Sequence, residues 1–388
     1  MNNFNFYAPT YFAFGKGKEA EVGALVKRFG GTKVLIHYGG GSVKKNGVFD
    51  KVVKSLDDMQ IPYVELGGVK PNPRSGLVYT GIELCRKENV DFILAIGGGS
   101  AIDSAKAIAM GVPYDGDFWD FYSKGIPVEK SLPVGTVLTI SAAGSEGSSG
   151  SVITHEESML KWSAGGDVVR PKFSILNPEF TCTVSAYQTA CGITDIMIHV
   201  FERYFTNTTN VETTDRLCEG LLKAMIEEGP KVMKDLTNYE ARANIMWAGM
   251  IAHNNILGVG RDQDWATHNI EHELSALYDC AHGAGLAVIS PAWMKYVYKH
   301  DVNRFAQFAV RVWGCEMNFA NPEITALEGI ARFENFLKSL GMPTNFTDIG
   351  AKEEDIPYMV SQLCKRPGVG SFVKLGAKDF EEIYRLAL

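Results

Sequence analysis

The sequence predicts two domains of different class, an α/β domain over residues 1–183 followed by an all-helical domain over residues 184–388. The first prediction rests on alternation, because short β-rich runs and segments with helical spacing of apolar residues follow one another in the first half. The second rests on a change near Cys182–Ser185, after which every segment has helical spacing. With 388 residues, the chain is long enough for two domains that share a cleft.

Strands in the first half are expected where β-branched and apolar residues run together between turn signals. Helices between successive strands are typical of a parallel sheet covered on both faces. The expected strands are Lys33–Tyr38, Tyr63–Glu65, Asp91–Ile96, Val134–Ile140 and Lys172–Leu176. The expected helices are Val48–Met59, Gly76–Lys87 and Ala101–Met110.

The second half contains only segments with helical periodicity, several of them separated by glycine or proline turn signals. This pattern predicts a helical domain without a sheet. The expected helices are Ser185–Phe205, Val211–Lys234, Tyr239–Leu257, Trp265–Tyr278, Gly283–Tyr298, Val302–Trp313, Pro322–Leu340 and Glu353–Leu363.

Composition limits the classes of partner. The net charge of −7 argues against a broad nucleic-acid surface, because polyanion binding needs clustered lysines and arginines. Seven dispersed cysteines fit free thiols in a reducing compartment. The first residues lack the basic start and apolar run of a signal peptide, and no apolar stretch is long enough to cross a bilayer. We therefore expect a cytoplasmic protein with neither nucleic-acid nor membrane partners.

A glycine-rich turn, Gly97-Gly98-Gly99-Ser100, lies directly between an expected strand and an expected helix. Glycines there let the backbone approach a ligand closely, and the N–H groups at a helix start attract phosphate. The turn lacks the GxGxxG spacing of the standard dinucleotide fingerprint. Phosphate binding is the functional interpretation, and a merely tight turn is the alternative.

A second turn, Gly39-Gly40-Gly41-Ser42, also follows a strand and precedes Lys44 and Lys45. Dinucleotide folds often place an acidic residue here to hold the adenosine ribose hydroxyls. Small residues, a hydroxyl and two lysines suit a ribose 2′-phosphate better than a bare ribose. The alternative is an exposed turn with solvated lysines.

Asp195 and His199 stand four residues apart on an expected helix, so both face one side and can bind one ion. His268 and His272 have the same spacing, and His282 follows across an expected turn. One carboxylate and three imidazoles suit Zn²⁺ or Fe²⁺. Spacing alone does not decide between His272 and His282 as the last ligand.

Two acidic residues beside these histidines, Glu271 and Glu273, are expected to be solvated or capping charges.

Several motifs follow one another along essentially the whole chain. They are Tyr38-Gly39-Gly40-Gly41-Ser42, Pro71-Asn72-Pro73, Gly97–Lys106, Thr139, Gly144-Ser145-Glu146, Asp195–His199, and Asp264–His268 through to Ala281-His282. In this order they resemble the iron-containing (group III) alcohol dehydrogenase family, in its butanol dehydrogenase and NADPH-dependent aldehyde reductase branch. One departure is Ala143, where related reductases often carry a threonine that offers a hydroxyl to the cofactor.

The resemblance implies a Rossmann-like dinucleotide-binding domain and an all-α metal-binding domain, together the dehydroquinate synthase-like architecture. It implies that Asp195, His199, His268 and His282 hold one divalent metal, Fe²⁺ or Zn²⁺. It places His272 beside the metal, as a proton relay or as a positioning residue. The cofactor, NADP(H) with NAD(H) as the alternative, is expected at Gly39, Gly40, Ser42, Asn72, Gly97, Gly98, Gly99, Ser100, Asp103, Thr139, Ser145 and Lys161.

These features predict a hydride-transferring oxidoreductase that reduces short- to medium-chain aldehydes such as butyraldehyde. The ion is expected to act as a Lewis acid and the nicotinamide to carry the hydride. The alternatives are a polyol oxidoreductase like glycerol dehydrogenase, a lyase like dehydroquinate synthase, or a non-catalytic protein that binds nucleotide and metal. Family members usually self-associate through N-terminal strands, and the β-forming residues of Phe4–Phe14 therefore predict a homodimer.

Overall fold

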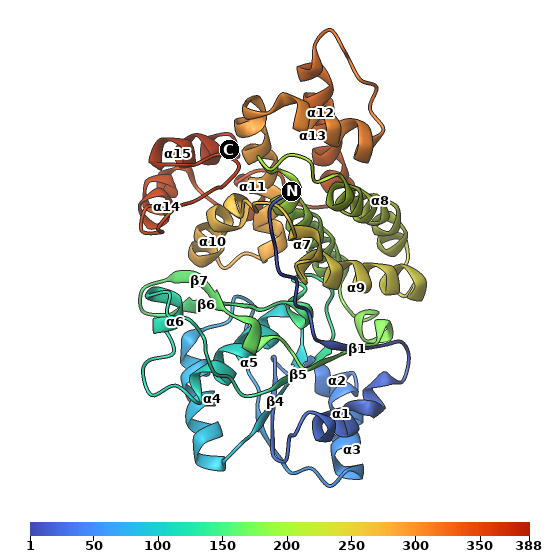
Figure 1. The fold of residues 1–388 in the computed structure, drawn as a ribbon, viewed down its shortest axis with the longest axis vertical. Helices are drawn as coiled ribbons and strands as arrows, with labels where there is room; N and C mark the ends of the chain where they lie inside the picture. Colours follow the sequence, from blue (N-terminus) through green and yellow to red (C-terminus); the bar gives the residue numbers. More distant parts are fainter. The chain divides into compact units, whose positions relative to one another are not determined.

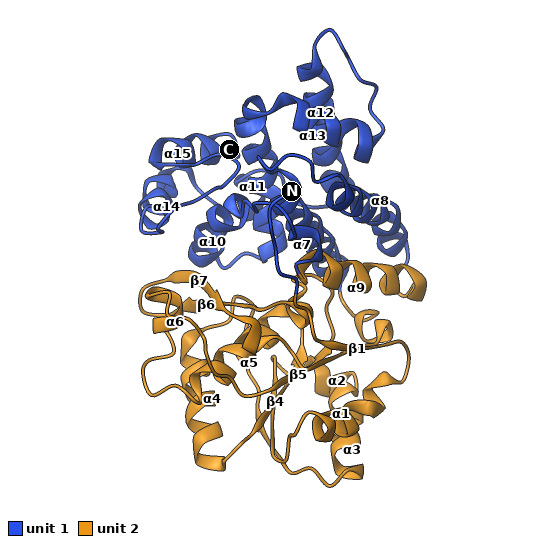
Figure 2. Ribbon diagram, viewed as in Figure 1, with its two compact units in different colours: residues 1–6, 185–236, 255–388 blue, residues 7–184, 237–254 orange.

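The computed structural model describes all 388 residues, which divide into the two compact units coloured in Figure 2. Unit 2 comprises residues 7–184 and 237–254, and unit 1 comprises residues 1–6, 185–236 and 255–388. Helix α9 (Tyr239–His253) thus belongs to unit 2, although the sequence places it in the helical half. Met246 enters the core of unit 2, and the ring of Trp247 meets that of Phe12 edge-on at 6.0 Å. The two-segment division at residue 183 itself stays a prediction.

Unit 2 is built on a parallel six-stranded sheet with the order β1-β8-β5-β4-β2-β3, which confirms the predicted α/β class. Figure 1 labels β1, β4 and β5 of this sheet. A separate antiparallel hairpin joins the remaining two strands. The sheet strands are β1 (Tyr11–Phe14), β2 (Val34–Tyr38), β3 (Tyr63–Leu66), β4 (Phe92–Gly97), β5 (Val134–Leu138) and β8 (Phe173–Leu176). The hairpin strands are β6 (Gly150–His155) and β7 (Leu160–Gly165).

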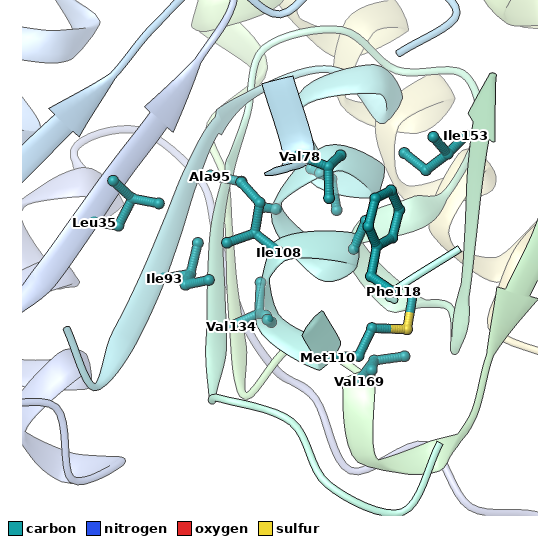
Figure 3. Packing of buried hydrophobic residues seen from close by; sticks show 14 of the residues in the cluster. Leu35, Val78, Ile93, Ala95, Ile108, Met110, Phe118, Val134, Ile153 and Val169 are labelled. Carbon is teal, nitrogen blue, oxygen red and sulfur yellow. The ribbon is translucent and has the colours of Figure 1, made fainter. Parts of the chain in front are cut away.

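Successive side chains of the strands enter two different cores, because a strand presents alternate residues to opposite faces. Leu35 and Ile93 pack with α4 and α5, as Figure 3 shows around Ile108. Val34 and Ile36 enter the other core, with α1 and α3. The helices of unit 2 are α1 (Val22–Arg28), α2 (Ser42–Lys45), α3 (Val48–Asp58), α4 (Ser75–Glu88), α5 (Gly99–Gly111), α6 (Asp120–Ser123) and α9.

The order of the strands reverses between β2 and β4. From β2 the chain moves outward to β3 and then returns to the opposite side of β2 to form β4. Tyr38 is paired with Ile96 in this register, so the turns that follow β2 and β4 lie beside each other at the carboxyl edge. Ligands of open α/β sheets bind outside the carboxyl ends of the strands at such a reversal. The fold therefore brings the two glycine-rich turns to the expected position.

Unit 1 is helical, and its core is rich in aromatic side chains. Phe205, which directly follows α7, stacks on Phe305 of α12 with 4.4 Å between ring centroids, and Phe201 meets Phe308 edge-on. No helix in the structure is both long enough and apolar enough to cross a membrane. The helices are α7 (Ala186–Tyr204), α8 (Glu212–Lys234), α10 (Ala266–Tyr278), α11 (His282–Val297), α12 (Val302–Trp313), α13 (Pro322–Ser339), α14 (Ile356–Leu363) and α15 (Ala377–Arg385).

Some local predictions were wrong. The helix predicted over Tyr239–Leu257 ends at His253, because Asn255 adopts a left-handed backbone conformation with φ 79° that interrupts the helix. The sequence analysis also gave no strand for the β6–β7 hairpin and no helix for α1, α6 or α15.

Candidate functional site

The turn after β4 is closely packed. A Cβ atom on Gly99 would lie 2.8 Å from Cβ of Ala143, and one on Gly97 would lie 2.7 Å from Cβ of Ala101. Gly98 is the N-cap residue of α5, and no side chain caps this end of the helix. The first N–H groups of a helix have no intrahelical partner, so Gly99 and Ser100 offer donors suited to a phosphate.

The turn after β2 depends on glycine at one position. Gly41 has φ 105°, a left-handed conformation that side chains disfavour, whereas a Cβ on Gly40 would have no neighbour within 4 Å. Gly39 is similarly open, since its Cβ would only touch the carbonyl oxygen of Val69 at 3.5 Å. The open space at Gly39 and Gly40 leaves the backbone before Ser42 accessible to a ligand.

Lys106, which the sequence analysis quoted only as part of a motif, is fully buried in unit 2. Its Nζ donates hydrogen bonds to the carbonyl oxygens of Ser145 (2.6 Å), Ser148 (2.9 Å) and Gly150 (2.9 Å). Burial lowers the pKa of Lys106 to about 8, while the nearby Asp103 carboxylate acts in the opposite direction. The lysine therefore fixes the loop that carries Ser145, one of the predicted cofactor residues.

Asp103 contacts the same loop. One carboxylate oxygen accepts a hydrogen bond from Oγ of Ser145 at 2.5 Å, and the other accepts one from the backbone N–H of Val152 at 3.0 Å. Burial raises the pKa of Asp103 above its usual range, against the charge of Lys106. Asp103 and Ser145 are thus brought together, as their shared role in the prediction requires.

Three further predicted cofactor residues lie in unit 2. Nζ of Lys161, on β7, donates a hydrogen bond to Oδ1 of Asn72 at 2.9 Å, and both side chains are buried. Asn72 has φ 51°, and its neighbour Pro73 is tied to β6 through the N–H of Thr154 at 2.8 Å. Thr139 follows β5, and its N–H donates to the carbonyl oxygen of Gly97 at 3.0 Å.

In unit 1, three of the predicted metal ligands surround a carboxylate oxygen of the fourth. Oδ1 of Asp195 lies 3.6 Å from Nδ1 of His199 and 3.6 Å from Nε2 of His268. Nε2 of His282 lies 3.8 Å from the same oxygen. Asp195 and His199 are one turn apart on α7, His268 is on α10, and His282 is the first residue of α11.

The candidate ligand atoms of this cluster are not all equally close to one another. The ligand atoms of Asp195, His268 and His282 all lie within 4.8 Å of one another, a set that excludes His199. The imidazole of His199 instead stacks on that of His268, with 4.7 Å between ring centroids. His272 belongs to a second such group with Glu271 and His282, and its ring lies 5.7 Å from that of His282.

Two buried carboxylates orient the imidazoles. Oε1 of Glu202 lies 2.8 Å from Nδ1 of His268, and Oε2 of Glu271 accepts from Nδ1 of His282. Because a carboxylate only accepts, each Nδ1 carries a proton, and Nε2, on the side of Asp195, is the ring atom that a metal ion would coordinate. Metal-binding histidines are oriented in this way.

The expectation of solvated carboxylates at Glu271 and Glu273 was wrong. Glu271 is fully buried against His282, and Glu273 is buried and paired with Nη2 of Arg366 at 2.7 Å. The hydrogen-bond partner of each carboxylate lies elsewhere in the chain, which local sequence does not show. Sequence analysis also missed Glu202, although it lies on the same face of α7 as Asp195 and His199.

The residues present fit a divalent cation. Oδ1 of Asp195 and Nε2 of His268 are buried atoms without a hydrogen-bond partner, an arrangement that is costly unless a ligand satisfies both. Burial lowers the pKa of His268, but its interactions with Asp195 and Glu202 outweigh this effect and raise the pKa to about 9. The surroundings therefore stabilise positive charge at this position.

Two family models cover the chain. One, described as "Iron-containing alcohol dehydrogenase", matches residues 9–178, and the other, "Fe-containing alcohol dehydrogenase family, C-terminal", matches residues 189–388. These matches agree with the resemblance found in the sequence motifs.

Individual proteins match over their full length. The chain is 43% identical to NADH-dependent butanol dehydrogenase A of Clostridium acetobutylicum, with 99% of each protein covered. It is 39% identical to NADPH-dependent aldehyde reductase YqhD of Escherichia coli, with 94% of this chain and 93% of the relative covered. The crystal structure of NADH-dependent butanol dehydrogenase A from Thermotoga maritima superposes with a TM-score of 0.97 at 42% identity, covering 100% of this chain and 99% of that one.

Proposed function

Because the chain belongs to the iron-containing alcohol dehydrogenase family, we propose that it transfers hydride between a nicotinamide cofactor and short- to medium-chain aldehydes or alcohols. Reduction of aldehydes such as butyraldehyde is the proposed main direction. The names of the relatives, butanol dehydrogenase and aldehyde reductase, support this substrate class. The observation that carries the proposal is the convergence of three imidazoles on Oδ1 of Asp195.

In this proposal, one divalent ion, Fe²⁺ or Zn²⁺, is held by Asp195, His199, His268 and His282. When bound, the ion supplies Lewis-acid chemistry to the carbonyl group of the substrate. Glu202 and Glu271 keep the rings of two ligands in the orientation that the ion requires. The ring of His272 lies beside that of His282, which makes His272 the candidate for moving a proton to the reduced oxygen.

The cofactor is proposed to bind unit 2 at the carboxyl edge of the sheet, where the order of the strands reverses. The pyrophosphate is assigned to Gly97–Ser100 at the start of α5, and the adenosine ribose to Gly39, Gly40 and Ser42. NADP(H) is the proposed cofactor, with NAD(H) as the alternative, and its nicotinamide supplies the hydride. The residues assigned to position the remainder of the cofactor are Asn72, Asp103, Thr139, Ser145 and Lys161.

A homodimer is proposed through the N-terminal strand. β1 pairs only with β8, so one of its edges is open to a second chain. The aromatic side chains of Phe4, Phe6 and Tyr7, which precede β1, are exposed. Light scattering of the purified protein tests this, since a monomeric mass at micromolar concentration would contradict it. A cytoplasmic location is also proposed, because all seven cysteines are thiols rather than disulfides.

Substitution of the ligands tests the function. Asp195→Ala and His268→Ala are expected to lose bound metal and NADPH-dependent reduction of butyraldehyde while they keep nucleotide binding. Glu273→Gln is the matched control, because Glu273 is a buried carboxylate on α10 that pairs with Arg366. Metal per chain, nucleotide binding by calorimetry and loss of NADPH absorbance are measured, with glycerol and NADP⁺ as the test of the polyol alternative. A normal rate from Asp195→Ala after chelation would refute the proposal.

A further inference from the structure

Three side chains from neighbouring parts of unit 2 meet beside the turn after β2. Oε2 of Glu65, on β3, accepts hydrogen bonds from Nζ of Lys44 at 2.6 Å and from Oη of Tyr38 at 3.0 Å. The ammonium group of Lys44 also lies over the ring of Phe49, 4.3 Å from its centroid. Lys44 thus has a defined partner, which differs from the solvated lysine that the sequence left open.

Backbone contacts hold this cluster against the turn. The N–H of Lys44 donates to the carbonyl oxygen of Gly41 at 3.1 Å. On the other side, the segment that follows β3 is tied to the turn, because Gly68 N–H donates to the carbonyl oxygen of Gly39 at 3.0 Å. The helix that contains Lys44 and the segment that follows Glu65 are therefore both hydrogen-bonded to the turn that carries Gly39 and Gly40.

We propose that Glu65 sets the selectivity between NADPH and NADH by competing with the ribose 2′-phosphate for Lys44. This inference rests on the proposed binding of the adenosine ribose at Gly39, Gly40 and Ser42. A 2′-phosphate attracts Lys44 but is repelled by Glu65, and the carboxylate must be displaced before the lysine can bind it. A bare 2′-hydroxyl group carries no charge, so Glu65 does not repel it and need not be displaced from Lys44.

The opposite charges of Glu65 and Lys44 decide whether each substitution raises or lowers the affinity for NADP⁺. Glu65→Gln removes the repulsion and releases Lys44, so affinity for NADP⁺ should rise by about 3- to 10-fold, with that for NAD⁺ nearly unchanged. Lys44→Gln should lower affinity for NADP⁺ by a similar factor. Both side chains of the pair are partly exposed, so the effect should shrink in 1 M salt.

The test measures binding without turnover. Calorimetry gives the dissociation constants of adenosine 2′,5′-bisphosphate and ADP, and of NADP⁺ and NAD⁺, for the full chain and each variant. The matched control is Glu88→Gln, which removes a carboxylate from another partly exposed ion pair, with Lys33 at 3.0 Å, and changes the net charge equally. This control should leave both affinities unchanged.

Three results separate the inference from the function on which it rests. A selectivity shift in Glu65→Gln that is absent from Glu88→Gln supports the inference. Nucleotide binding with the same NADP⁺-to-NAD⁺ ratio in wild type, Glu65→Gln and Lys44→Gln overturns it and leaves the proposed function standing. No binding of either nucleotide by the wild-type chain overturns both.

Discussion

Gly283 of α11 packs against the backbone of α7 beside the proposed metal ligands, and Gly283→Ala should disturb them. A Cβ on Gly283 would lie 2.2 Å from the carbonyl oxygen of Cys191 and 2.7 Å from its Cα. Cys191 is one turn before Asp195 on α7, and Gly283 follows His282 directly. The atoms that the new Cβ would meet belong to the backbone of Cys191, so rotation of a side chain cannot remove the clash.

The required displacement follows from these distances. Real Cβ contacts essentially never fall under 3.0 Å, so the two helices must separate by about 0.8 Å, the difference between 3.0 and 2.2 Å. Overpacking of this kind costs about 1–3 kcal/mol. A misplacement of about 1 Å in a catalytic group lowers turnover by roughly 100-fold. His282 moves with α11, so metal retention should fall together with kcat/KM.

Gly220→Ala is the matched control for Gly283→Ala. Gly220 is an exposed residue inside α8, and a Cβ there would have no neighbour within 4 Å. Alanine should stabilise this helix by about 0.5–1 kcal/mol. Metal per chain, thermal unfolding and kcat/KM are measured for both variants. Wild-type metal content and an unchanged melting temperature in Gly283→Ala would refute the reasoning.

Two further predictions concern buried groups. Glu202→Gln and Glu271→Gln should each weaken metal binding by about 10- to 100-fold, because the carboxylates orient His268 and His282. Competition with a chelator measures the metal affinity of each variant. An affinity equal to that of the wild type would contradict the proposed orientation. His37 is fully buried, and burial lowers its pKa to about 4 from 6.5. The unfolded chain then binds more protons than the folded chain between these values, so stability should be complete above pH 6.5 and fall by roughly 3 kcal/mol as the pH decreases toward 4. The free energy of unfolding in urea should depend less steeply on pH in His37→Gln than in the wild type. The same dependence in both proteins would be evidence against His37 as the source of this effect.

Much of the sheet could be predicted from local sequence. β4 is a continuous apolar run and β2 is apolar except for His37, and such runs between turn signals are typical of parallel strands buried on both faces. β1 is different, because Tyr11–Phe14 pairs with Phe173–Leu176, and no local pattern shows which distant strand completes such a pair. The expected family and the alcohol or aldehyde oxidoreductase class are confirmed by the family models and the full-length relatives.

The candidate metal cluster shows which contacts can be predicted from the spacing of residues in the sequence and which cannot. Spacing places Asp195 and His199 on one face of α7, and the same rule, extended by one turn, would have included Glu202 at the seventh residue after Asp195. Glu271 is a different case, because it faces His282 only through the turn between α10 and α11.

A carboxylate beside histidines is read as solvated when its partner is unknown, since burying it alone is costly. In the structure Glu271 is not buried alone, because Nδ1 of His282 donates a hydrogen bond to its carboxylate. Glu65 follows the same logic at the other candidate site, where the lysine that local sequence assigns to a phosphate already has a carboxylate partner. In both cases the sequence points to a candidate binding residue, His282 or Lys44, but only the fold brings the acidic partner to it.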